Sequence, residues 1–198
     1  MELKNSETFK NLKKAFIAEC AARTRYEFVE YGERYNGYEG LAEIVDKIAY
    51  QEFNHARMLY THIEKVTDKT INDESVSADL PFRQRWNLKE NLKLTAEDEE
   101  NEAKFYKNAK KIAEKEGFKD IAALFDMIEK VEIKHKKIFE YLYEKLNSDE
   151  LYKSDVEKRW ICSVCGYEEK GNEAFKECPL CKAKLETVKV ILPKELAV

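Results

Sequence analysis

The stretch Tyr-Gln-Glu-Phe-Asn-His at residues 50–55 decides the fold, because it places a carboxylate and an imidazole three residues apart in a strongly helical context. The same Glu-x-x-His spacing recurs in Val-Glu-Ile-Lys-His at residues 131–135. Side chains three positions apart on a helix point to one face. Two such units on two helices can therefore hold a metal between them.

The second unit belongs to a longer internal repeat. Residues 10–66 align with residues 90–146 at a constant shift of 80 positions, without a gap. Under this shift Gly37 falls on Gly117, and each glycine follows an expected helix. Two Glu-x-x-His units and two interhelix glycines at one shift indicate internal repetition. We interpret the chain as a duplicated helix pair.

Apolar periodicity predicts four long helices, at about residues 5–35, 38–66, 82–116 and 119–147. The polar stretch at residues 67–82 has no helical period and is too long for a helix hairpin, so we expect a crossover there. The predicted fold class is mainly α: a four-helix bundle with a long crossover between helices 2 and 3, followed by a small β module. We expect the bundle at residues 1–147, a linker at 148–158 and the module at 159–198.

The repeat predicts further metal ligands that a motif search misses. Glu19 falls on Glu99, and each precedes the glutamate of its own Glu-x-x-His unit by 33 positions. One glutamate from each of two helices and a Glu-x-x-His unit from each of the other two is the arrangement of di-iron and di-manganese carboxylate proteins. The predicted ligands are Glu19, Glu52, His55, Glu99, Glu132 and His135.

Two interpretations of these six residues are open. Because 37% of the chain is charged, an isolated Glu-x-x-His unit can lie on a solvated helix face by chance. Each of the six residues, however, lies among apolar positions of its own helix. Each buried carboxylate without a counter-charge destabilises the folded state by on the order of several kcal/mol. We therefore favour bound cations.

Three further residues near this set have predicted roles. Glu102 lies three residues after Glu99 on the same face, but its counterpart in the repeat is Ala22. We predict that it is a seventh ligand on one side, and the alternative is a carboxylate at the rim. Tyr26 and Tyr106 each follow a lone ligand glutamate by seven residues, and we expect them to support ligand carboxylates by hydrogen bonds. They could also be ordinary core tyrosines.

Two other residues are interpreted as structural. Cys20 follows Glu19 directly and is expected to be a small buried apolar residue rather than a reactive thiol. His62 lies seven residues after His55 but has no counterpart in the second half, so we interpret it as a structural or surface residue.

A second metal constellation lies near the C-terminus. Two Cys-x-x-Cys pairs are separated by 12 residues, and together they predict tetrahedral thiolate coordination of one Zn or Fe ion by Cys162, Cys165, Cys178 and Cys181. A disulfide scaffold is the alternative. The module is too small for an ample core, so a metal must supply much of its folding energy. Alternating residues at 187–191 predict a closing strand.

Composition excludes some function classes. A net charge of −4 gives no basic footprint for nucleic acid or for an anionic membrane surface. The sequence contains no apolar run of signal-peptide or membrane-spanning type, so we expect a cytoplasmic protein.

With these motifs identified, the chain resembles rubrerythrins along essentially its whole length. The resemblance implies a ferritin-like di-iron bundle followed by a rubredoxin-like iron-tetrathiolate domain at residues 159–198. The resemblance rests on residues 19–26, 51–55, Glu99 with Glu102, 132–135, and the two Cys-x-x-Cys pairs. It implies two irons in the bundle, a third iron on the four cysteines, and a peroxidase that reduces hydrogen peroxide to water in anaerobic or microaerophilic cells. It also implies a homodimer and an electron donor such as reduced rubredoxin or an NAD(P)H-dependent reductase.

One spacing departs from the family pattern. Family members place the third-helix tyrosine eight residues after the first glutamate, whereas Tyr106 follows Glu99 by seven. Alignment from the tyrosine would put Asp98 and Asn101 at the ligand positions, but the internal repeat supports Glu99 and Glu102. Two other functions stay open: a ferroxidase or oxidase that consumes Fe(II) and O2, and a non-enzymatic interaction protein with a Zn-ribbon tail.

Overall fold

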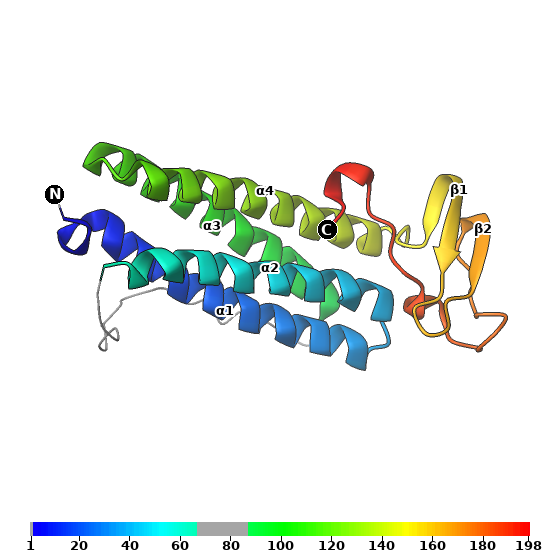
Figure 1. Cartoon of the computed structure of the whole chain (residues 1–198). Helices are drawn as coiled ribbons and strands as arrows, with labels where there is room; N and C mark the ends of the chain where they lie inside the picture. The colour runs from blue at the N-terminus through cyan, green and yellow to red at the C-terminus, as the bar shows by residue number, and fades with distance from the viewer. Residues whose placement is uncertain (1, 67–86) are drawn as a thin grey trace.

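The computed structural model describes residues 2–66 and 87–198, which form four long α-helices and a small β module (Figure 1). The helices are α1 (Glu7–Tyr35), α2 (Glu39–Glu64), α3 (Leu88–Glu116) and α4 (Lys119–Asn147). The predicted four-helix fold is confirmed. The predicted crossover at residues 67–82 and the expected start of the third helix at residue 82 lie outside the described residues. Among the described helices, none has an apolar stretch long enough to cross a membrane.

The helix ends are set by local chemistry, and only the glycines between the helices follow the repeat. At the start of α1, Ser6 Oγ accepts a hydrogen bond from the Phe9 amide, and at the start of α3 the Asn87 side chain accepts one from the Glu90 amide. Such caps satisfy amides that have no partner inside the helix. Gly37 lies between α1 and α2, and Gly117 lies between α3 and α4. Their φ values are 87° and 89°. This left-handed region favours glycine.

The helices pack as two hairpins, α1 with α2 and α3 with α4, and α1 also contacts α3 (Figure 1). The apolar core between them forms two separate clusters. One contains Leu12, Leu59 and Phe125, and the other contains Ile48 and Phe139. A layer of buried glutamate and histidine side chains lies among these apolar positions of the four helices. The bundle therefore positions charged side chains where an ordinary bundle has apolar ones.

The β module consists of β1 (Lys153–Ile161) and the antiparallel β2 (Glu168–Glu173), with Trp160 opposite Glu169. Trp160 is buried, and its indole N–H donates to the Gly171 carbonyl at 3.0 Å. β1 begins inside the segment expected to be a linker, and Leu151 and Tyr152 just before it are buried. The strand pairing therefore starts closer to the bundle than the polar composition indicated.

The closing strand predicted at residues 187–191 is wrong. The chain instead makes a short 3-10 turn at Leu185–Thr187 and a single bridge between Cys162 and Val188. The Val188 amide bonds to the Leu185 carbonyl within this turn. The backbone then leaves the module to contact the bundle, so the ladder stops after one bridge.

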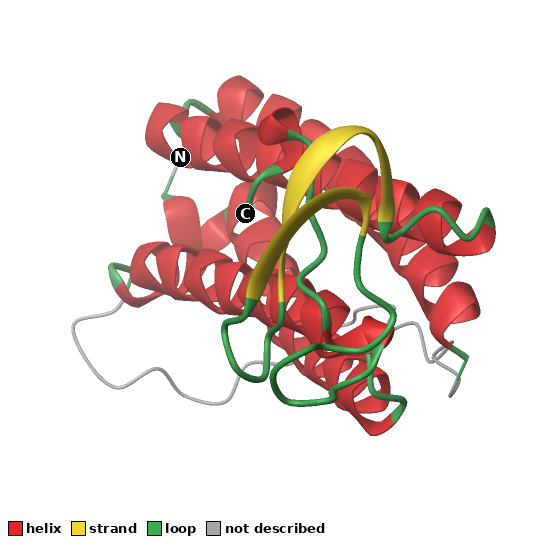
Figure 2. Cartoon of the chain, turned by 90° about the vertical axis from the view of Figure 1, so that its right-hand side faces the viewer, coloured by secondary structure: helices red, strands yellow, loops and turns green. Residues whose placement is uncertain are grey.

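The module packs against one end of its own bundle (Figure 1), and its two strands lie in front of the helices when that side faces the viewer (Figure 2). A Cβ atom added at Gly40 would lie 1.9 Å from the Val188 carbonyl oxygen, so only glycine fits at this approach. Lys189 pairs with Glu43 at 3.3 Å. The C-terminal segment returns along α4, where Lys134 Nζ donates to the Ala197 carbonyl at 2.6 Å (Figure 1).

Candidate metal centres

The bundle places all six predicted side chains of the repeat in one buried cluster. Their carboxylate oxygens and imidazole nitrogens form two groups, and within each group these atoms lie within 4.8 Å of one another. The first group is Glu19, Glu52, His55 and Glu132, and the second is Glu52, Glu99, Glu132 and His135. The groups share Glu52 and Glu132, and a shift of 80 positions converts one group into the other. Such sharing is what two adjacent cations bridged by carboxylates require.

The distances in the two groups are nearly the same. His55 Nδ1 lies 3.4, 2.9 and 3.0 Å from carboxylate oxygens of Glu19, Glu52 and Glu132. His135 Nδ1 lies between 2.9 and 3.7 Å from the three carboxylates of its own group. The two imidazole rings stack with their centroids 6.0 Å apart. In each half the Nδ1 atom therefore points at the carboxylates, as a ligand nitrogen must.

The two predicted tyrosines bind ligand-type carboxylates across the bundle. Tyr26 Oη, on α1, donates to Glu99 Oε1 on α3 at 2.5 Å. Tyr106 Oη, on α3, donates to Glu19 Oε1 on α1. Burial raises the pKa of both phenols well above the ordinary value, with the neighbouring glutamates adding to the effect. Both hydroxyls therefore stay protonated and remain donors.

Burial and neighbouring charges shift the pKa values of the ionisable groups in the cluster in opposite directions. Burial, followed by the charge of Glu132, raises the pKa of Glu19 well above its ordinary value, and burial raises that of Glu99 to about 8. Burial acts in the same direction on Glu52, but the two histidines hold the pKa of Glu52 below its ordinary value. Protons on the histidines and on some carboxyls thus balance the charge in the absence of a cation.

The donor set fits two bound cations. Glu19 Oε2 and Glu99 Oε2 are fully buried and have no hydrogen-bond partner. Buried polar atoms normally have a hydrogen-bond partner, so the absence of one at each of these oxygens favours a bound cation. Four carboxylates would neutralise two divalent cations, and carboxylate with imidazole is a donor set that suits iron. The cluster is therefore a buried Glu/His site of the di-metal type.

A contact that the motif spacing did not reveal orients one imidazole. The Nε2–H of His135 donates to Gln51 Oε1 at 2.7 Å, which leaves Nδ1 free to face the carboxylates. The position equivalent to Gln51 in the second half is Val131. No described residue makes the corresponding hydrogen bond to His55 Nε2. This break in the repeat was visible in the sequence and could have indicated the contact.

Glu102 differs from the six repeat residues. It belongs to neither group of close ligand atoms. Its Oε1 atom instead accepts a hydrogen bond from Arg25 Nη2 at 3.2 Å, and its Oε2 atom has no partner. Its role as a seventh ligand stays a prediction.

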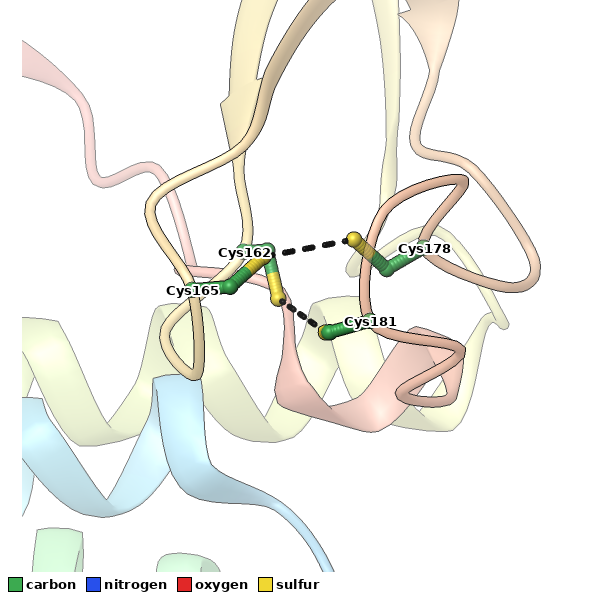
Figure 3. A group of neighbouring side chains, drawn as sticks. All are labelled: Cys162, Cys165, Cys178 and Cys181. Carbon is green, nitrogen blue, oxygen red and sulfur yellow. Dashed lines mark hydrogen bonds between the residues drawn. The ribbon is translucent and has the colours of Figure 1, made fainter.

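The four cysteines of the module point their sulfur atoms toward one another (Figure 3). Cys162 and Cys181 have their sulfurs 3.7 Å apart, and Cys165 and Cys178 have theirs 3.6 Å apart. All four are free, so the disulfide alternative does not hold here. A tetrahedron with metal–sulfur bonds of about 2.3 Å has edges of about 3.8 Å. The cluster is therefore already of the size that one metal ion needs.

Backbone amides favour the thiolate form of one of the four cysteines, Cys178. Burial acts to raise the pKa of Cys178, but the amides of Cys181 and Leu180 bring it down to about 7. A thiol with that pKa gives up its proton readily, and metal binding requires the thiolate.

The two residues interpreted as structural have different outcomes. Cys20 is exposed, so the expectation that it is buried is wrong. It lies on the outer face of α1, although the adjacent Glu19 points into the core. His62 Nδ1 lies 3.7 Å from Asp120 Oδ2, and His62 belongs to neither Glu/His group.

Two family models match the chain. The Rubrerythrin family model matches residues 10–143 and again residues 90–161, so the second match begins 80 positions after the first. The chain belongs to the rubrerythrin family. The model of the family's rubredoxin-like domain matches residues 160–187, which contain all four cysteines of the cluster.

Individual relatives match most of the chain. Rubrerythrin from Clostridium perfringens is 33% identical over 180 residues, which is 90% of this chain and 91% of that protein. A structure of fully reduced nigerythrin has a TM-score of 0.62 at 24% identity and covers 96% of this chain and 94% of its own. A bacterioferritin from Desulfovibrio desulfuricans has a TM-score of 0.60 at 20% identity and covers 73% of this chain and 82% of its own. The structural likenesses establish the fold: a ferritin-like bundle followed by a rubredoxin-like module.

Proposed function

We propose that this chain is a non-haem di-iron peroxidase that reduces hydrogen peroxide to water. The single observation that carries the proposal is the pair of overlapping buried Glu/His groups on the same chain as a four-cysteine cluster. One site has the oxygen and nitrogen donors of a redox-active iron pair, and the other has the thiolates of a one-electron iron centre. Membership of the rubrerythrin family supports the same assignment.

The proposed ligands are the residues predicted from the repeat and the cysteine pairs. Two irons would be held by Glu19, Glu52, His55, Glu99, Glu132 and His135, with Glu102 as a proposed seventh ligand. A third iron would be held by Cys162, Cys165, Cys178 and Cys181. When bound, the iron pair would supply the two electrons that convert hydrogen peroxide and two protons to two water molecules, and an iron on the four cysteines would supply one-electron chemistry to restore them.

The chain's own residues orient the ligands and exclude water. Tyr26 and Tyr106 hold Glu99 and Glu19 in place across the bundle, and Gln51 fixes the ring of His135. The four shared and lone glutamates are fully buried, so solvent does not compete for their oxygens. Removal of a residue that orients a metal ligand in this way typically lowers metal affinity or activity by about 10- to 100-fold.

The proposed partners follow from this chemistry. Hydrogen peroxide is the substrate, and the electrons come from reduced rubredoxin or from an NAD(P)H-dependent reductase. We propose that the chain works as a homodimer.

Steady-state turnover tests the proposal. The iron-loaded protein, reduced by an NADH-linked donor, is expected to consume peroxide much faster than the metal-free protein, and the Glu132→Gln variant is expected to resemble the metal-free protein. Equal rates with and without metal would contradict the peroxidase. Faster consumption of Fe(II) and O2 than of peroxide would support the ferroxidase alternative instead. A colourless protein whose only metal is zinc on the cysteines would support the interaction-protein alternative.

A further inference from the structure

A buried ion pair connects the two halves of the bundle beside the Glu/His cluster. Arg25, on α1, is only 8% exposed, and its Nη2 atom lies 3.2 Å from Glu102 Oε1 on α3. Its guanidinium lies over the Tyr26 ring, 5.8 Å from the ring centroid. At the equivalent positions the repeat has Phe105 for Arg25 and Ala22 for Glu102. The cluster therefore has this ion pair on one side only.

The pair lies within reach of the cluster. Glu102 follows Glu99 by three residues on α3, so the two carboxylates share a face. Burial and then the charges of Glu99, Glu19 and Glu132 raise the pKa of Glu102. The side chain of Glu102 is 16% exposed, and its Oε2 atom is buried without a hydrogen-bond partner.

The guanidinium and a bound metal would thus compete for the carboxylate of Glu102. The guanidinium of Arg25 binds Oε1, and a metal in the adjacent group would attract the unpartnered Oε2. An arginine keeps its proton at any working pH, so the guanidinium remains a competing cation throughout. The outcome depends on how firmly the guanidinium holds the carboxylate.

We propose that Arg25 is a positioning residue that competes with the metal pair for Glu102 and so limits how tightly that side of the cluster binds metal. This proposal rests on the proposed di-metal function. Without the guanidinium, Glu102 loses its counter-charge and becomes available to the cations. It also joins a set of carboxylates that repel it when no metal is bound. Loss of Arg25 is therefore expected to destabilise the metal-free protein and to tighten metal binding.

Co(II) titration of the full chain measures the second effect, after the cysteine site has been filled with one equivalent of Zn(II). Arg25→Gln is expected to tighten Co(II) binding in the bundle about tenfold, the order of effect known for residues that position metal ligands. The same substitution made together with Glu102→Gln is expected to leave the affinity equal to that of Glu102→Gln alone. Equal shifts in the presence and absence of Glu102 would overturn the proposal, as would no shift at all.

Arg23 offers a matched control on the same helix. It pairs with Glu27 at 2.5 Å and has no contact with the cluster, so Arg23→Gln is expected to leave Co(II) binding unchanged. If Arg23→Gln tightened Co(II) binding as much as Arg25→Gln, the effect would come from the loss of any positive charge on this helix, and the proposal would be overturned.

Thermal unfolding gives an independent readout. Arg25→Gln is expected to lower the Tm of the metal-free protein by about 10 °C, because it leaves a buried carboxylate unpaired. Metal is expected to restore most of this loss, since Glu102 then has a cation to bind. An equal loss in the metal-free and metal-loaded proteins would overturn the proposal.

If Arg25→Gln does not fold without metal, Arg25→Lys serves in its place. It keeps the charge but loses the planar fork of donors, and it is expected to tighten Co(II) binding by a smaller factor, about threefold. No shift with Arg25→Lys in that case would overturn the proposal. Failure of the wild-type bundle to bind Co(II) at all would instead contradict the proposed function.

Discussion

The two halves of the bundle contribute the same three ligand-type residues each but differ in the residues around them. Glu19, Glu52 and His55 of the first half correspond to Glu99, Glu132 and His135 of the second, and the distances within the two groups nearly coincide. The surroundings break the symmetry, because the first half contributes Gln51 and Arg25, and the second contributes Glu102. The repeated residues thus form the site, and the unrepeated ones make its two sides unequal.

The largest effect is expected from the two glutamates that both groups share. Glu52→Gln and Glu132→Gln each remove one carboxylate from both groups, so each is expected to weaken binding of the metal pair by more than about 100-fold. Because the two positions are related by the repeat, the two losses are expected to be alike. Co(II) titration of the bundle site measures them. A variant that still binds two cations with normal affinity would contradict the shared role.

The six cluster residues could be predicted from the sequence because a shift of 80 positions carries one set onto the other. The four helices could also be predicted from the sequence, since their apolar periodicity is set by the core that they bury. The contact of Gln51 with His135 joins residues 84 positions apart and has no spacing rule. Only the departure from the repeat, where valine stands at position 131, pointed to it. The strand expected at residues 187–191 failed because packing against Gly40 overrode local alternation.

An intermediate effect is expected at Gln51. Gln51→Val gives the first half the residue that the second half has at position 131, and it removes the hydrogen bond that orients His135. Binding at the group containing His135 is expected to weaken by about 10- to 100-fold, while the group containing His55 changes little. Stepwise Co(II) titration separates the two sites.

The reverse exchange is the matched test of the same idea. Val131→Gln supplies an amide at the position equivalent to Gln51 and is expected to bring the affinities of the two groups closer together. Equal weakening of both sites by Gln51→Val would mean that the contact does not distinguish them.

The smallest effect is expected away from the metal cluster, at another position where the halves differ. Glu33 is buried without a partner for either carboxylate oxygen, whereas its counterpart is Ala113. Burial and then the charge of Glu30 raise the pKa of Glu33 well above 4.5, against a lowering by Arg34. The folded protein therefore keeps a proton that the unfolded chain releases above that pH, so this group's contribution to stability falls as the pH rises.

Glu33→Gln removes this titration. The variant is expected to match the wild type near pH 4.5 and to become more stable than it at higher pH, at up to about 1.4 kcal/mol per pH unit until the folded-state pKa is passed. Urea unfolding at several pH values measures the difference in the free energy of unfolding. A difference that does not change with pH would show that Glu33 ionises equally in the folded and unfolded states.

The central claim is that one chain carries an iron pair in the bundle and a single iron on the cysteines. Metal analysis with optical and Mössbauer spectroscopy of protein purified from its native cells tests this most directly. We predict three irons per chain, one with four thiolate ligands and two with oxygen and nitrogen ligands. Recovery of one metal per chain, bound only by cysteines, would contradict the account and remove the bundle from the chemistry.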